Sequence, residues 1–126
     1  GEPMGLIPGL NQIRILADPH LVDIISATAS KIYDGAVHVG TIATGDQFIC
    51  SDEKSSAISR DFHAIACEME GGSIGQVCKL NQIPFVVFRT ISDHGDSDAA
   101  ISYTEFTKIT AQKSARTLCE ILPQLI

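Results

Sequence analysis

Hydrophobic residues recur with a helical period in three segments of the chain, and a fourth helix is indicated by its start. In the three periodic segments apolar residues return every three or four positions, which places them on one face of a helix. Asp18 followed by Pro19 is typical of a helix start, and Ser51 followed by two acidic residues is another. The pattern predicts helices over residues 19–32, 51–62, 70–80 and 102–122.

Short apolar runs rich in β-branched residues lie between these helices and predict strands. They cover residues 37–43, 64–67 and 85–91. The last run is continuously apolar over residues 85–88, which is typical of a parallel strand covered on both faces. Helices and strands therefore alternate, and this order predicts an α/β fold with parallel strands and right-handed crossovers.

Polar residues follow each of the three predicted strands at the point where the strand ends. In open α/β sheets, ligands bind outside the carboxyl ends of the strands. This edge would carry carboxylates, an aromatic ring and several glycines, which suits a small polar molecule with a planar ring and hydroxyl groups. The runs are Gly45-Asp46-Gln47-Phe48-Ile49, Glu68-Met69-Glu70-Gly71 and Ser92-Asp93-His94-Gly95.

Each of these runs also has a purely structural interpretation. Glu68 and Glu70 could be solvated acids at the positive end of a helix dipole, Asp93 could be a turn residue, and Phe48 could belong to the core. If the strand conformation continues, Glu68 and Glu70 face the same side, where a carboxylate could bind a pair of hydroxyls. Asp93 could act as a general acid if burial or the charge of Glu70 raises its pKa. The residues alone leave both interpretations open.

Charge and composition exclude several classes of protein. The net charge is −6 with nine Lys and Arg in no cluster, which argues against nucleic acid and anionic membranes as partners. No apolar run approaches the ~20 residues of a transmembrane helix, and the opening residues form no signal peptide. The four cysteines lack metal-binding spacing, so we expect buried, reduced thiols and a cytoplasmic protein. No phosphate-binding glycine motif is present, and we predict neither a metal nor a cofactor.

The extent of the predicted sheet suggests that the domain is incomplete. Three strands are few for a sheet that contains a run as apolar as residues 85–88, and the chain opens in a Gly/Pro-rich loop without an initiator Met. We therefore expect residues 1–126 to form a single partial domain. Its unpaired sheet edge would favour self-association.

The chain resembles the methylthioadenosine/S-adenosylhomocysteine nucleosidases in three runs: Gly45-Asp46-Gln47-Phe48-Ile49, Glu68-Met69-Glu70-Gly71 and Arg89-Thr90-Ile91-Ser92-Asp93. His94 and Gly95 depart from the commoner residues of the family. The Gly45–Ile49 run is the most discriminating, because the wider purine nucleoside phosphorylase superfamily shares Glu-Met-Glu and Ser-Asp. The resemblance covers nearly the whole chain but matches only the C-terminal half of the family. It implies the C-terminal part of a nucleoside-phosphorylase-like three-layer α/β/α fold with a mixed central sheet, without the N-terminal half.

The resemblance also implies a reaction and a role for individual residues. Water would break the bond between adenine and ribose in the nucleoside substrate, and Asp93 would protonate N7 of the leaving base. Glu70 would hold the ribose hydroxyls. Pro8 lies in a segment that, in this family, completes the site of the partner subunit in a homodimer. The other predicted substrate contacts are Glu68 and Met69 beside the sugar, Phe48 on the adenine face, Ile49 at its edge, Ser92 beside Asp93, and Tyr103 at the 5′-alkylthio group.

No residue of the chain matches the water-activating glutamate of the family, which belongs to the N-terminal half. We therefore expect the complete protein to hydrolyse methylthioadenosine or S-adenosylhomocysteine, and this chain alone to be inactive or nearly so. Two alternatives stay open. One is a purine nucleoside phosphorylase, which needs phosphate, and the other is a non-catalytic module that binds a purine ligand or a partner.

Overall fold

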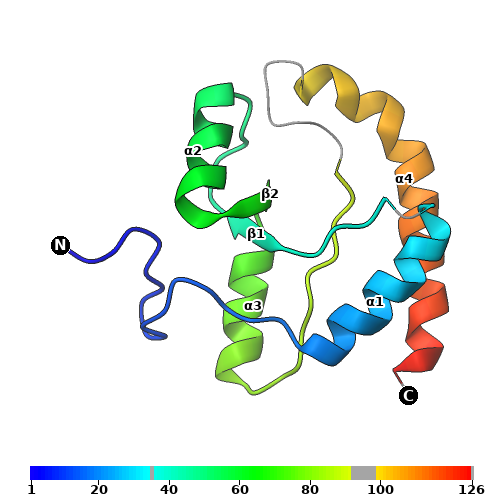
Figure 1. Cartoon of the computed structure of the whole chain (residues 1–126), viewed down its shortest axis with the longest axis horizontal. Coiled ribbons are helices and arrows are strands. Elements are labelled where there is room, and N and C mark those ends of the chain that lie inside the picture. Colours follow the sequence, from blue (N-terminus) through cyan, green and yellow to red (C-terminus); the bar gives the residue numbers. More distant parts are fainter. Residues whose placement is uncertain (35, 92–98, 126) are drawn as a thin grey trace.

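The computed structural model describes residues 1–34, 36–91 and 99–125, without the side chains of residues 99–106, 108 and 109. Four α-helices and two strands occur along these residues and alternate as far as the third helix, which confirms the predicted α/β class (Figure 1). In chain order the elements are α1 (Pro19–Ile32), β1 (Thr41–Thr44), α2 (Asp52–Phe62), β2 (Ala64–Glu68), α3 (Gly71–Leu80), α4 (Ala99–Ile121) and a short 3-10 helix, η1 (Leu122–Gln124).

The two strands pair in parallel and end side by side. Thr44, the last residue of β1, lies opposite Glu68, the last residue of β2, and the register is irregular between Thr41 and Ile42. The Gly45 amide extends the pairing by donating to the Glu68 carbonyl at 3.1 Å. Helix α2 makes the crossover between the strands, as the sequence predicts, and α3 begins directly after β2. The polar runs after β1 and β2 therefore leave from one edge of the sheet.

Local sequence signals explain where α1 and α2 begin, but not where α4 begins. The Asp18 side chain accepts a hydrogen bond from the Leu21 amide at 3.0 Å, and Pro19 occupies the first turn, as predicted for α1. Ser51 occupies the N-cap of α2 without a side-chain cap bond. Helix α4 begins at Ala99, three residues before the predicted start at residue 102.

The third predicted strand is wrong for this chain, because residues 85–91 carry no strand pairing. The run is extended and passes beside the sheet on its way to α4 (Figure 1). It is held by the Asp18 amide, which donates to the Phe85 carbonyl at 2.8 Å, and by Thr90, whose hydroxyl lies 2.9 Å from that of Ser114. A strand exists only where a second backbone supplies its ladder, and none of the described residues does so here.

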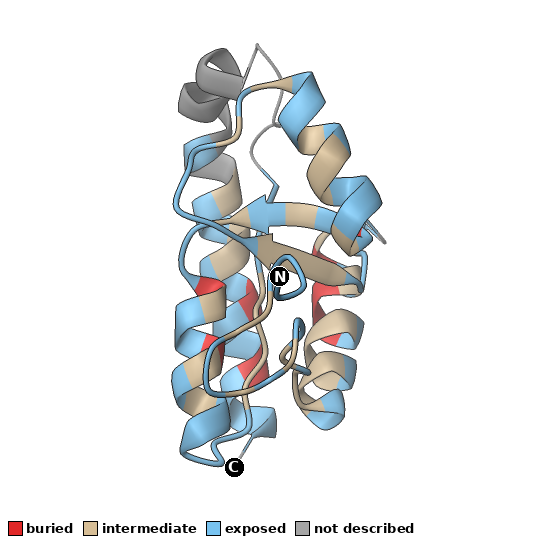
Figure 2. Cartoon of the chain, turned by 90° about the vertical axis from the view of Figure 1, so that its left-hand side faces the viewer, coloured by how far each residue is buried: buried red, intermediate tan, exposed pale blue. Residues whose placement is uncertain are grey.

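The hydrophobic core is small for a chain of this length. Among the described residues the buried hydrophobic side chains are Ala29 and Ile32 of α1, Ala64 of β2 and Ile121 of α4 (Figure 2). Helix α1 packs against α4, and this pair holds most of the core. The expected burial of the thiols is wrong, because Cys50, Cys67 and Cys119 are exposed and Cys78 is half-buried.

Candidate functional site

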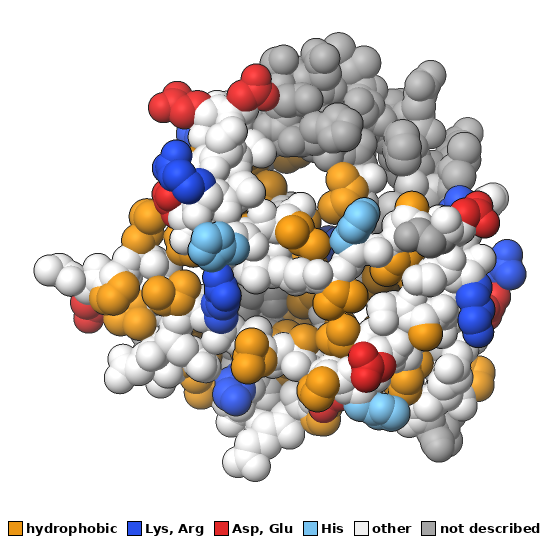
Figure 3. Space-filling model, viewed as in Figure 1, with side chains coloured by type: hydrophobic (Ala, Val, Ile, Leu, Met, Phe, Trp, Pro, Cys, Tyr) orange, Lys and Arg blue, Asp and Glu red, His pale blue; other side chains and the backbone are white. Residues whose placement is uncertain are grey.

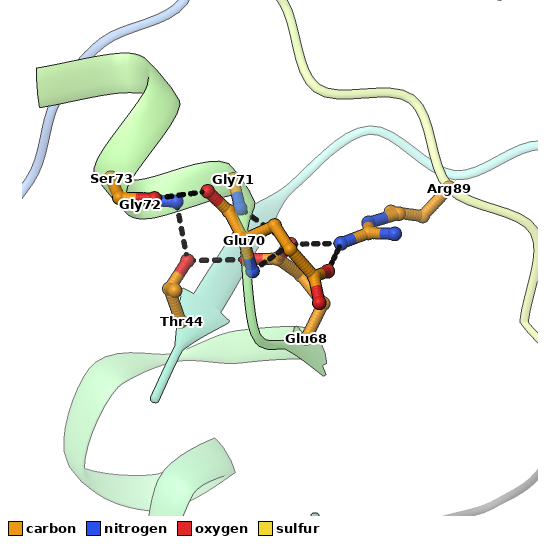
Figure 4. A network of polar contacts seen from close by, with 7 residues as sticks. All are labelled: Thr44, Glu68, Glu70, Gly71, Gly72, Ser73 and Arg89. Carbon is orange, nitrogen blue, oxygen red and sulfur yellow. Dashed lines mark hydrogen bonds and ion pairs between the residues drawn. The ribbon is translucent and has the colours of Figure 1, made fainter. Parts of the chain in front are cut away.

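The polar edge at the ends of β1 and β2 is organised around one carboxylate, that of Glu68 (Figure 4). Its Oε1 accepts a hydrogen bond from the Thr44 hydroxyl. Its Oε2 accepts from the Glu70 amide at 3.0 Å, from the Gly71 amide at 2.6 Å and from Nη2 of Arg89. Only 7% of the Glu68 side chain is exposed. The carboxylate thus joins β1, β2, the start of α3 and the extended run.

These donors keep Glu68 ionised. Burial by itself raises the pKa of Glu68, but hydrogen bonds from Arg89, Thr44, Gly71 and Glu70 outweigh it and lower the pKa to about 2. Two of these donors are backbone N–H groups in the first turn of α3, where the helix dipole also favours negative charge. The carboxylate therefore works as a cap for α3 as well as an ion-pair partner.

Arg89 brings the two glutamates of the Glu-Met-Glu run together. Its Nη2 donates to Oε2 of Glu68 and to Oε2 of Glu70. Hydrogen bonds from the guanidinium, first to Glu68 and then to Glu70, raise the pKa of Arg89. The Glu70 side chain is 64% exposed and makes no cap bond to α3 although Glu70 is the N-cap residue. Glu68 and Glu70 therefore face one side, as predicted, but only Glu70 presents its carboxylate to solvent.

Glycines at the start of α3 permit this close packing. A Cβ at Gly72 would lie 2.8 Å from both Cβ and Oγ1 of Thr44, and one at Gly71 would lie 3.0 Å from Oε1 of Glu68. The Gly72 amide donates to the Thr44 hydroxyl at 2.7 Å, and the hydroxyl in turn donates to Glu68. The close approach of this helix start to Thr44 and Glu68 therefore depends on glycine at both positions.

The other predicted site residues make no described contact with this cluster. Phe48 is 57% exposed in the loop between β1 and α2, with Ile49 half-buried beside it. Met69 is 44% exposed between the two glutamates, and Pro8 is exposed in the N-terminal loop. Ser92 and Asp93 lie outside the described residues, as does the side chain of Tyr103.

An open hollow of about 1670 Å³ lies next to the polar cluster. It is lined by β1, by residues 85–91 and by parts of α1 and α3, and hydrophobic side chains surround it on the face shown in Figure 3. Glu68 and Arg89 are at its wall, whereas Phe48, Ile49, Met69, Glu70 and Pro8 are not among the lining residues. Of the predicted substrate contacts that the structure describes, Glu68 alone therefore lines the hollow.

Two residues of the cluster were given no role by the sequence. Arg89 stands at the end of a continuously apolar run, and a lone cation in that position is a signal for a nearby acidic partner. Thr44 ends a strand rich in β-branched residues, so nothing in its sequence context distinguishes it. In the described part of the chain no three His, Cys, Asp or Glu side chains group as metal ligands do, and no helix has the length and apolarity to span a membrane.

Comparison with known proteins places these features in a family. A family model described as the phosphorylase superfamily matches residues 5–126. A 5′-methylthioadenosine/S-adenosylhomocysteine nucleosidase of Haemophilus influenzae is 38% identical over 126 residues, which are 99% of this chain and 54% of that protein. An aminodeoxyfutalosine nucleosidase of Campylobacter jejuni is 35% identical over 125 residues, again 99% of this chain and 54% of that protein.

A solved structure has the same fold over its matching part. It is a 5′-methylthioadenosine/S-adenosylhomocysteine nucleosidase from Neisseria meningitidis in complex with methylthio-immucillin-A. It superposes with a TM-score of 0.86 at 35% sequence identity, and the match covers 97% of this chain and 53% of that one. The nucleoside-phosphorylase-like fold is thereby confirmed. The chain spans about half the length of the curated relatives it matches.

Proposed function

Because this chain belongs to the phosphorylase superfamily, we propose that it is part of a nucleosidase that hydrolyses the N-glycosidic bond of methylthioadenosine or S-adenosylhomocysteine. Relatives that match almost all of the chain are nucleosidases by name, one for 5′-methylthioadenosine and S-adenosylhomocysteine and another for aminodeoxyfutalosine. Of the two alternatives, phosphorolysis and ligand binding without catalysis, neither has an observation in its favour.

One observation carries the proposal most directly: the exposed carboxylate of Glu70 at the carboxyl ends of the paired strands. A 64% exposed carboxylate that keeps an ion pair with Arg89 is able to accept hydrogen bonds from two vicinal hydroxyls. A sugar bound there would lie against Met69, which is half exposed beside Glu70. The negative charge of Glu70 would also favour the positive charge that develops on the ribose as the bond breaks.

The proposed reaction balances as a simple hydrolysis. Water adds to C1′ of the ribose while the bond from C1′ to N9 of adenine breaks, and the electron pair of that bond leaves with the base. Asp93 gives a proton to N7 so that adenine leaves as a neutral molecule, and the proton lost by water restores the balance. Ser92 orients Asp93, Phe48 stacks on the base, and the Ile49 backbone bonds to its edge. Tyr103 borders the 5′-substituent.

We further propose that residues 1–126 are one part of a single domain that needs its other part for activity. The hollow of about 1670 Å³ beside β1 and residues 85–91 is where the rest of the sheet would pack. The complete domain would form a homodimer in which the segment around Pro8 approaches the partner's site. We also propose a cytoplasmic location for the complete protein.

The test uses a completed protein, by which we mean this chain fused to the portion of the Haemophilus influenzae relative that it does not cover. Methylthioadenosine, S-adenosylhomocysteine and aminodeoxyfutalosine are offered separately, with and without inorganic phosphate, and the free base is measured by chromatography. We expect base release that does not depend on phosphate from the completed protein, and background rates from the 126-residue chain. In the completed protein, Asp93→Asn should lower kcat by about 10²–10⁴-fold.

Three results would contradict the proposal in different ways. Turnover only with phosphate, yielding a sugar phosphate, would identify a phosphorylase. Adenine binding by calorimetry without turnover in a folded completed protein would identify a binding module. Rapid adenine release by the 126-residue chain alone would show that the other part is not needed.

A further inference from the structure

Glu68 and Glu70 belong to one short motif, but their surroundings differ sharply. The Glu68 side chain is 7% exposed and accepts hydrogen bonds from Thr44, Glu70, Gly71 and Arg89. The Glu70 side chain is 64% exposed, and among the described residues its carboxylate contacts only Arg89. A carboxylate offers about four acceptor positions. The protein therefore fills those of Glu68 and leaves those of Glu70 largely available.

We propose that Glu68 is a positioning residue of the nucleoside site, which acts on the sugar through Glu70 without contacting it. This inference rests on the function proposed above. It assigns Glu68 a place behind the site, in contrast to the direct substrate contact that the sequence predicts.

Glu68 positions Glu70 in the first place through the backbone. Its Oε2 accepts the amides of Glu70 and Gly71, so the turn between β2 and α3 is fixed at the residue that carries the exposed carboxylate. Thr44 links the same oxygen pair to β1, because its hydroxyl donates to Glu68 while accepting from the Gly72 amide at 2.7 Å. Figure 4 shows these contacts meeting at one carboxylate. The direction of the Glu70 side chain is thus set from both strands.

Glu68 also governs how tightly Arg89 holds Glu70. One nitrogen of the guanidinium, Nη2, serves both carboxylates, so the positive charge is shared between them. Two carboxylates beside one guanidinium leave the cluster with a net negative charge, and the exposed member can turn its oxygens towards a ligand. If Glu68 became neutral, Arg89 would pair with Glu70 alone. Ribose hydroxyls would then compete with the full positive charge of Arg89 for the carboxylate oxygens of Glu70.

Glu68→Gln tests this arrangement, because the amide keeps the size of the side chain but replaces an acceptor with a donor. In the completed protein we would measure kcat and KM for methylthioadenosine and the inhibition constant of adenine, which has no sugar. Wild type, Glu68→Gln, Glu70→Gln and the double variant form a cycle. Glu120→Gln is the matched control, since it breaks another Arg–Glu pair, with Arg116 on α4 at 2.8 Å.

We expect Glu68→Gln to lower kcat/KM for methylthioadenosine by about 10–100-fold, as small displacements of a positioned group do. The inhibition constant of adenine should stay within about twofold, because in the proposed site Glu70 binds the sugar and not the base. The double variant should be no worse than Glu70→Gln by more than about threefold, since Glu68 acts through Glu70. Glu120→Gln should match the wild type in every constant.

Other outcomes overturn the inference. Losses that multiply in the double variant would place Glu68 in direct contact with the sugar, and a parallel loss of adenine affinity would make its role merely structural. Unchanged kcat and KM in Glu68→Gln would show that Glu68 does not position the site. If Glu68→Gln does not fold, Thr44→Val removes one donor at nearly constant shape and must lower kcat/KM without changing adenine inhibition. A folded wild-type completed protein that releases no adenine refutes the proposed function itself, before any variant is compared.

Discussion

At the scale of single residues, Glu68 combines two properties that rarely coexist without strong partners: it is nearly buried and it is charged. Its pKa of about 2 lies well below the ordinary value of 4.5. A group whose pKa is lower in the folded than in the unfolded state stabilises the fold above the unfolded pKa. That contribution is lost as the pH falls from about 4.5 towards 2, because the folded state must then accept the proton it disfavours.

The ionisation of Glu68 should therefore make the free energy of unfolding depend on pH. At pH 7 we expect Glu68→Gln to lower the free energy of unfolding of the completed protein by about 3 kcal/mol, which corresponds to a shift of this size in one pKa. The difference from wild type should fall to less than half by about pH 3. Urea unfolding followed by circular dichroism at a series of pH values measures both quantities.

Glu120→Gln serves as the control for this experiment too. Glu120 is 42% exposed and pairs with Arg116 on the surface of α4, so its loss should cost at most about 1 kcal/mol. A difference between wild type and Glu68→Gln that is the same at pH 7 and pH 3 would mean that packing, and not ionisation, accounts for the effect.

The sequence predicted the two glutamates of the site correctly as a pair on one side but could not separate their roles. Spacing in a motif says which residues are near one another, whereas burial depends on what packs over each of them. Arg89 is an example of such packing, because it contacts both carboxylates from a segment about twenty residues away along the chain. The contacts of Phe48, Met69 and Pro8 with substrate stay predictions.

At the scale of elements, the start of α3 depends on how close it can come to β1. The Gly72 amide reaches the Thr44 hydroxyl only because no side chain intervenes, since a Cβ would lie 2.8 Å from both Cβ and Oγ1 of Thr44. Both atoms are near the backbone of a paired strand, so they cannot swing away as the end of a long side chain would. The helix would have to move.

Gly72→Ala should therefore destabilise the protein in spite of the better helix propensity of Ala. We expect a net loss of about 1–3 kcal/mol, because overpacking and the lost Thr44 bond outweigh the gain of up to about 1 kcal/mol in propensity. The thermal midpoint of the completed protein measures it. Gly45→Ala is the control, as its Cβ would meet nothing within 4 Å and should change stability by less than about 0.5 kcal/mol. Equal stability of the two variants would contradict this account of α3.

The helices were predictable to within a few residues because their signals are local. Asp18 with Pro19 fixes the start of α1, and apolar periodicity fixes the faces of the helices. The prediction of a strand over residues 85–91 was wrong because strand pairing does not depend on local signals alone. The apolar, β-branched composition of these residues suits a central strand, but a strand also needs a partner backbone, which depends on distant chain. For the same reason the first strand was predicted too long. The prediction covered residues 37–43, whereas β1 covers Thr41–Thr44 and ends one residue later.

At the scale of the whole molecule, the chain exposes more surface than its mass requires. Its accessible surface is 9017 Å², whereas a compact monomer of 13.5 kDa has about 6500 Å². The excess of about 2500 Å² is several times what one protein contributes to an interface of standard size, about 800 Å². Much of it is apolar, because large hydrophobic side chains are exposed on both strand and helices. Examples are Ile65 on β2, Ile74 and Val77 on α3, and Leu118 on α4. Surface of this kind is typical of the inside of a domain.

The isolated chain should therefore associate with itself, and its completion should stop this. We expect light scattering of the purified 126-residue chain to give a mass above 13.5 kDa that rises with concentration, together with strong binding of a hydrophobic dye such as anilinonaphthalene sulfonate. In the completed protein the extended backbone of residues 85–91 should gain pairing partners and the hollow should be filled, so dye fluorescence per chain should fall several-fold while the mass settles at a fixed value. A chain that stays monomeric at every concentration without binding dye would show that its apolar faces are covered by its own residues, and the requirement for a second part of the domain would lose its physical basis.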